Sequence, residues 1–159
     1  MIKIVSGDIL KVTSGVIVQQ VNCKGAMGAG LAKQIRSKYP GIYNEYLSFI
    51  KRETDENVGS KSLLGKVQYY FPPYLTYGYD VSIANCFGQD GYGGGQQTVN
   101  TALRTALEQV RDDAEISGND IAIPWGLGCG LAGGDWDRVI RIILSIFKNS
   151  SADATIYVL

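Results

Sequence analysis

Three short segments of the chain are rich in glycine, and each directly follows an apolar run. Thirteen of the 20 glycines lie in residues 22–30, 85–95 and 126–134. Glycine lets the backbone approach a ligand closely and turn its N–H groups toward it. Two of the segments lead into predicted helices, at Leu31 and Asp135, so their amides lie at the positive end of a helix dipole. The segments predict an anion site, although tight turns between strands and helices would also use glycine.

The third segment contains a dinucleotide-type motif. Residues 128–133 read G-C-G-L-A-G and satisfy G-x-G-x-x-G. That motif needs an acidic residue at the end of the next strand, but here Asp153 precedes the next predicted strand. No G-x-x-x-x-G-K-[ST] sequence occurs, which argues against a P-loop nucleoside triphosphatase. We interpret residues 128–133 as a pyrophosphate-binding loop of another fold, and a nicotinamide-dinucleotide oxidoreductase stays an alternative.

Several chemistries are excluded by composition. The chain has no histidine, which excludes Ser–His and Cys–His pairs and most zinc enzymes. Cys23, Cys86 and Cys129 each fall in one glycine-rich segment without C-x-x-C spacing, so we expect packing residues and neither a metal site nor a cofactor. Lysine plus arginine equal aspartate plus glutamate at 15 each, so we expect no direct binding of nucleic acid.

Strands alternate with helices along the chain. Apolar and β-branched runs predict strands at Ile2–Ser6, Gly15–Val21, Val67–Phe71, Asp80–Ala84, Asp120–Trp125 and Thr155–Leu159. Apolar residues at helical spacing predict helices at Leu31–Tyr39, Ile42–Glu53, Thr98–Ser117 and Trp136–Phe147. This alternation predicts a mostly parallel sheet covered on both faces. The glycine-rich segments would then leave its carboxyl edge, where such sheets bind ligands.

The length of 159 residues suits a single domain spanning residues 1–159. Residues 2–5 are strand-like and too short for a leader or a membrane span. We therefore expect a monomeric, cytoplasmic protein with no membrane partner.

Three stretches resemble the ligand-binding elements of macrodomains. Gly7-Asp8-Ile9 resembles their G-D-[I/L] element, residues 21–32 resemble their first ligand loop, and residues 124–136 resemble their second. The order, the spacing and the closing strand at residues 156–159 agree over essentially the whole chain. The resemblance implies a three-layer α/β/α sandwich with a mixed, mostly parallel central sheet, and ADP-ribose as ligand. The branch it most resembles contains terminal ADP-ribose protein glycohydrolase, an antitoxin that removes ADP-ribose from DNA, and the yeast-type ADP-ribose-1″-phosphate phosphatase.

The resemblance also implies roles for individual residues. Asp8, beside Ile9, would accept a hydrogen bond from the adenine amino group, and Asn22 would face the distal ribose; a plain turn or capping role is the alternative for each. Asn85 and Leu159 match further ligand contacts of the glycohydrolase. The remaining ligand-binding positions, mostly backbone around the two phosphates, are Gly28, Ala29, Gly30, Gly126, Leu127, Gly128, Cys129, Gly130, Leu131 and Ala132.

The chain departs from the glycohydrolase where that enzyme does its chemistry. No lysine or arginine occurs from Val67 to Leu103, the stretch in which the glycohydrolase and the DNA antitoxin carry a reactive lysine. Ala132 stands where the glycohydrolase has its catalytic acid. Asp135 could activate a water for attack at the 1″ position, but aspartate is also a preferred helix N-cap. Asp90 is a second candidate acid.

We therefore expect binding of ADP-ribose and hydrolysis of a derivative at its distal ribose, with Asp135 as the catalytic residue. Removal of the 1″-phosphate is the preferred activity. Release of ADP-ribose from modified protein or nucleic acid, and non-catalytic binding of ADP-ribose, are the alternatives.

Overall fold

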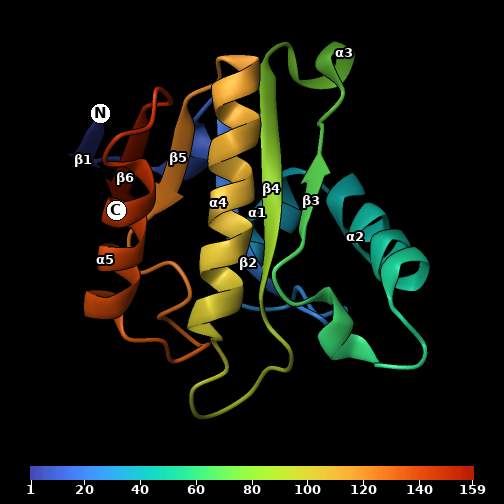
Figure 1. The fold of residues 1–159 in the computed structure, drawn as a ribbon. Coiled ribbons are helices and arrows are strands. Elements are labelled where there is room, and N and C mark those ends of the chain that lie inside the picture. Colours follow the sequence, from blue (N-terminus) through green and yellow to red (C-terminus); the bar gives the residue numbers. More distant parts are fainter.

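A six-stranded sheet forms the central layer of the computed structural model, which describes all 159 residues (Figure 1). In chain order its strands are β1 (Ile2–Ser6), β2 (Ser14–Asn22), β3 (Val67–Tyr70), β4 (Asp80–Gln89), β5 (Ile121–Pro124) and β6 (Ala154–Val158). Their order across the sheet is β1-β6-β5-β2-β4-β3, and only the β3–β4 pair is antiparallel. Five strands therefore end at one carboxyl edge.

Helices cover both faces of the sheet, so the predicted three-layer sandwich is confirmed. The α-helices are α1 (Gly30–Lys38), α2 (Gly41–Glu53), α3 (Tyr74–Tyr77), α4 (Asn100–Ser117) and α5 (Trp136–Phe147), and the 3₁₀ helices are η1 (Ile9–Lys11) and η2 (Ser60–Leu63). Helices α1 and α2 pack in one apolar core, and α4 and α5 pack in the other. Figure 1 shows α4 along the sheet and α3 at the end opposite the loop after β4. No helix is long and apolar enough to span a membrane.

Strand β2 is buried on both faces because it lies between β5 and β4. Val16 and Val18 point into the α4–α5 core, whereas Ile17 and Val21 point into the α1–α2 core. A strand with two apolar faces tolerates polar side chains only where they are hydrogen-bonded or functional. Gln19, Gln20 and Asn22 are the polar residues near the carboxyl end of β2.

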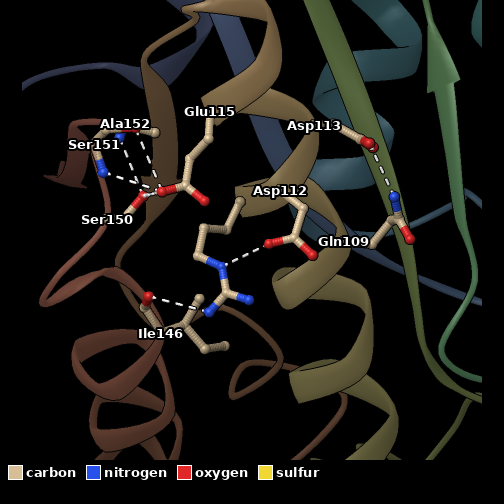
Figure 2. Close-up of polar contacts among 9 residues, drawn as sticks. Gln109, Asp112, Asp113, Glu115, Ile146, Ser150, Ser151 and Ala152 are labelled. Atoms are coloured by element: carbon tan, nitrogen blue, oxygen red, sulfur yellow. Dashed lines mark hydrogen bonds and ion pairs between the residues drawn. The ribbon is translucent and has the colours of Figure 1, made fainter.

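Charged side chains of helix α4 form hydrogen bonds with α5 and with the turn between α5 and β6 (Figure 2). Oε2 of Glu115 accepts hydrogen bonds from Oγ of Ser150 and from N of Ser151, both over 3.1 Å. Nη1 of Arg111 donates to the carbonyl oxygen of Ile146 over 3.5 Å. These contacts join the two helices of one layer beyond their apolar packing.

The predicted elements lie close to the observed ones, with one main exception. Strand β4 was expected to end at Ala84, but it continues to Gln89. Residues 85–89 pair with β2, and part of this stretch also pairs with β3, so pairing overrides the local signals of Asn85 and Gly88. Helix α3 was not predicted. Residues 54–62, for which neither a helix nor a strand was predicted, hold one isolated bridge and the start of η2.

Replacement of one core residue of α5 should measure how much this layer stabilises the fold. Ile143 is completely buried, and its neighbour Leu144 is 45% exposed. We expect Ile143→Ala to lower the free energy of unfolding by about 2–5 kcal/mol, because it leaves a cavity. Leu144→Ala should lower it by roughly 0.5 kcal/mol or less beyond helix propensity effects. Urea unfolding of both variants tests this, and equal losses would contradict the packing described.

Candidate functional site

Two adjoining cavities form a groove along the carboxyl edge of the sheet, and Leu31, Pro124 and Trp125 line both. The central cavity, of about 270 Å³, is also lined by Gln19, Gln20, Ala32, Gln89, Gly126, Leu127, Gly128, Gly130 and Ala132. The lateral cavity, of about 380 Å³, is also lined by Gly7, Asp8, Ile9, Gly30, Gln34, Tyr157, Val158 and Leu159. The groove therefore joins the Gly-Asp-Ile element to both glycine-rich loops.

Helix α1 begins at this groove without a cap. Its N-cap residue is Ala29, no side chain accepts a hydrogen bond from the first turn, and that turn holds no acidic residue. The backbone N–H groups of Gly30, Leu31 and Ala32 have no partner in the protein. Unsatisfied first-turn amides at the positive end of a helix dipole favour an anionic ligand.

The second loop, residues 126–134, also presents free amides. It is folded back on itself by hydrogen bonds from N of Cys129 to O of Gly126 (2.7 Å) and from N of Gly134 to O of Gly128 (3.0 Å). The N–H groups without a partner in the protein are those of Gly126, Gly128, Gly130, Leu131 and Ala132. Two loops with free N–H groups therefore border the same groove.

A hydrogen-bond network of three side chains fixes this loop against β2. Nε2 of Gln20 donates to Oε1 of Gln89 and to Oγ1 of Thr98, both over 2.8 Å, and Oγ1 of Thr98 donates to the carbonyl oxygen of Gly128 over 2.5 Å. Gly128 has φ +72°, and a Cβ there would lie 2.8 Å from Oε1 of Gln20. Glycine is required at this position by both the conformation and the contact.

Asp8 and its neighbours lie where the lateral cavity begins. Oδ1 of Asp8 accepts a hydrogen bond from N of Leu10 over 2.9 Å and so caps η1. Its second carboxylate oxygen makes no hydrogen bond within the protein. Ile9 and Leu159 line the same cavity. The capping role and a ligand-binding role are therefore compatible.

Asn22 holds the first loop together. Its Oδ1 accepts hydrogen bonds from N of Lys24 (3.0 Å) and N of Ala26 (3.2 Å), and its Nδ2 donates to the carbonyl oxygen of Ala26 over 2.8 Å. The hydroxyl of the fully buried Tyr46 also donates to Asn22 Oδ1, over 3.0 Å. Asn22 lines neither cavity, so the side chain shapes the loop in this structure.

Asn85 also differs from its expected position at the groove. It is completely buried within β4 and lines neither cavity. Its amide bonds to Gln19 and Gln68 on the neighbouring strands. Four other predicted ligand residues line neither cavity of the groove, and they are Gly28, Ala29, Cys129 and Leu131.

Asp135 caps helix α5. Its Oδ1 accepts a hydrogen bond from N of Asp137 over 3.0 Å, and its Oδ2 lies 3.8 Å from Nε of Arg138. Burial, and after it the charge of Asp135, raises the pKa of the Cys129 thiol to about 11, so this carboxylate lies near the second loop. Asp135 lines neither cavity.

Asp90 lies in the loop that follows β4, which we call the middle loop. Oγ of Ser60 donates to Oδ1 of Asp90 over 2.6 Å, and Nζ of Lys24 lies 3.7 Å from its Oδ2. Tyr92, in the same loop, is 65% exposed. Asp90 therefore ties the middle loop to the first loop and to η2, and it lines neither cavity.

The thiols are not reactive groups in this structure. Burial is the main cause that raises the pKa of both Cys23 and Cys86 to about 12. Neither these thiols nor Cys129 is a thiolate at neutral pH. No group of three or more cysteine, aspartate or glutamate side chains is arranged to hold a metal ion.

Sequence reasoning missed three contributors to the groove. Trp125 was not among the predicted ligand residues, but it lines both cavities and packs against Trp136 with ring centroids 4.9 Å apart. Gln19 and Gln20 line the central cavity. The only available signal was a pair of polar residues within the apolar run of β2.

Comparison with known proteins shows which of them share this fold. No family model matches the sequence. Two curated proteins named DNA ADP-ribosyl glycohydrolase, from Mycobacterium bovis and Mycobacterium tuberculosis, are 27% identical over 99% of this chain, which spans 42% of their length. The macrodomain of Mycobacterium tuberculosis DarG is 28% identical with a TM-score of 0.78, covering 99% of this chain and 97% of that one. The chain has the macrodomain fold.

The same macrodomain fold occurs in a structure described as Thermosipho africanus DarTG in complex with ADP-ribose. That structure matches with a TM-score of 0.81 at 20% identity and covers 98% of this chain and 41% of the other.

A matched pair of glycine substitutions should separate backbone strain from steric conflict in the macrodomain's second loop. Gly126 and Gly128 both have positive φ, +78° and +72°, but only at Gly128 would a Cβ meet other atoms within 4 Å. We expect Gly126→Ala to cost about 1–2 kcal/mol of stability. Gly128→Ala should cost roughly 1–3 kcal/mol more, because it displaces Gln20 and Thr98. Thermal unfolding measures both, and equal costs would mean that the Gln20 network does not hold this loop.

Proposed function

We propose that this macrodomain binds ADP-ribose along the groove. The observation that carries the proposal is the set of free backbone amides in two facing elements, the first turn of α1 and the second loop. Amides of this kind suit a diphosphate, which carries two negative charges and many acceptor oxygens. Asp8 would accept from the adenine amino group at the lateral end, and the second ribose would occupy the central cavity.

We further propose that the bound ADP-ribose is part of a larger substrate, which the macrodomain hydrolyses at the distal ribose. The likeness to two proteins named DNA ADP-ribosyl glycohydrolase supports release of ADP-ribose from a modified acceptor. The chain spans only 42% of their length, so their substrate is a proposal for this chain. Because no lysine or arginine lies between residues 67 and 103, the reaction would use a water molecule and no lysine adduct.

Removal of a 1″-phosphate is the second candidate activity. It shares the same site and the same requirement for a carboxylate that orients or deprotonates water. Asp135 is the candidate for both reactions, because its charge reaches Cys129 in the second loop. The two activities differ only in the leaving group on the distal ribose.

Exchange of Asp8 tests the adenine contact. Asp8→Asn can still cap η1, but its amide group would face the adenine amino group with a donor where an acceptor is needed. We expect ADP-ribose affinity to fall by about 1–3 kcal/mol, which is roughly 5- to 150-fold. The hypoxanthine analogue, which has a carbonyl oxygen acceptor in place of the adenine amino group, should bind the variant better than ADP-ribose does. Calorimetry that finds unchanged ADP-ribose affinity would remove Asp8 from the adenine site.

Substitution of Asp135 tests whether this residue takes part in catalysis or only caps α5. Asparagine is also a good N-cap, so Asp135→Asn should keep the stability of α5 and the affinity for ADP-ribose. We expect hydrolysis to fall by about 10²-fold or more, as when a general base is removed. The assay compares ADP-ribosylated DNA, ADP-ribosylated protein and ADP-ribose-1″-phosphate as substrates. Wild-type rates in Asp135→Asn would mean that Asp135 is only a helix cap. If the unaltered chain hydrolyses none of the three substrates, the protein is a non-catalytic ADP-ribose reader.

A further inference from the structure

Three amide side chains form a row across the buried α1–α2 face of the sheet. Gln68 on β3, Asn85 on β4 and Gln19 on β2 are direct neighbours in the strand pairing. Nε2 of Gln19 donates to Oδ1 of Asn85, and Nδ2 of Asn85 donates to Oε1 of Gln68, both over 2.7 Å. Gln19 is 1% exposed, Asn85 is fully buried and Gln68 is 6% exposed. We call these three side chains the amide row.

The amide row has one direction. Nε2 of Gln68 donates to the carbonyl oxygen of Tyr69 over 3.2 Å. If all three side-chain amides were flipped, Oε1 of Gln68 would face that carbonyl oxygen. If only one were flipped, two oxygens or two NH₂ groups would face each other. The row is therefore fixed with a carbonyl oxygen, Oε1 of Gln19, at the end nearest the central cavity.

This oxygen is the one atom of the row without a hydrogen bond. Oε1 of Gln19 is buried and has no partner in the protein, while Gln19 lines the central cavity. An unsatisfied buried acceptor is costly, and buried polar atoms are nearly always paired. No donor of the protein reaches this oxygen, so a donor bound in the adjoining cavity is the candidate partner for it.

We propose that Gln19 is a specificity-determining residue whose Oε1 accepts a hydrogen bond from a hydroxyl of the sugar in the central cavity. The inference rests on the proposed function, in which that sugar is the distal ribose of ADP-ribose. A sugar hydroxyl is a donor, whereas the oxygens of an ionised diphosphate are only acceptors and would be repelled by Oε1. Gln19 therefore recognises the sugar and not the phosphates. Oε1 of neighbouring Gln20 is also buried without a partner, but it packs against Gly88 and Gly128. Both N–H groups of Gln20 bond to Gln89 and Thr98, so we assign Gln20 to holding the second loop.

A pair of ligands and a pair of variants test this assignment. Gln19→Met keeps the length of the side chain and removes its carbonyl oxygen. We expect it to weaken ADP-ribose by roughly tenfold, the range of one buried hydrogen bond, and to change the affinity for ADP, which lacks the distal ribose, by less than about twofold. Gln68→Met is the control, since it breaks the far end of the row and lines neither cavity. It should leave the ratio of the two affinities unchanged.

The possible outcomes are distinct. Equal weakening of ADP and ADP-ribose by Gln19→Met would mean that Gln19 only supports the cavity wall, and unchanged binding of both would also overturn the proposal. If the unaltered chain does not bind ADP-ribose, the proposed function itself fails. A measurement on the unaltered chain avoids any folding defect: the side-chain amide resonances of Gln19 should shift on addition of ADP-ribose and not of ADP. Equal shifts with both ligands would contradict the inference.

Discussion

Backbone N–H groups without partners at the carboxyl edge of the sheet are the constraint on which the site depends. The first turn of α1 has no capping side chain, and the second loop leaves five amides free. At the start of α5, by contrast, Asp135 accepts a hydrogen bond from a first-turn amide. The parallel strands bring both sets of free amides to one edge, so the fold itself assembles a place for an anion.

No ionisable side chain lines the central cavity, which is unusual for a site proposed to catalyse hydrolysis. The groups that a ligand would contact there include backbone amides, the side-chain amides of Gln19, Gln20 and Gln89, and the Trp125 ring. The nearest candidate carboxylates, Asp90 and Asp135, each have a structural partner outside the cavities. Such a site can bind a charged nucleotide with neutral groups, and the proposed hydrolysis would use a carboxylate at the rim or a water oriented by the ligand.

Much of this macrodomain could be predicted from the sequence because its signals are local. The apolar stripe of α5 and the β-branched runs of β1 and β2 predicted those elements, and residues of the first and third glycine-rich segments line the groove. The end of β4 could not be predicted in the same way, because residues 85–89 are held by pairing with β2 and β3. The amide row could not be predicted from the sequence for the same reason. Gln19, Asn85 and Gln68 are far apart in the chain, and only the register of three strands brings them together.

The central claim is that free main-chain amides of two loops recognise the diphosphate of ADP-ribose. Amide proton and nitrogen chemical shifts, followed during titration with ADP-ribose, test it most directly. The account predicts large shifts for Gly30, Leu31 and Ala32 and for the free amides of residues 126–132, with little change in α4. If those amides keep their shifts in the presence of saturating ADP-ribose, the groove is not the ligand site and the account is wrong.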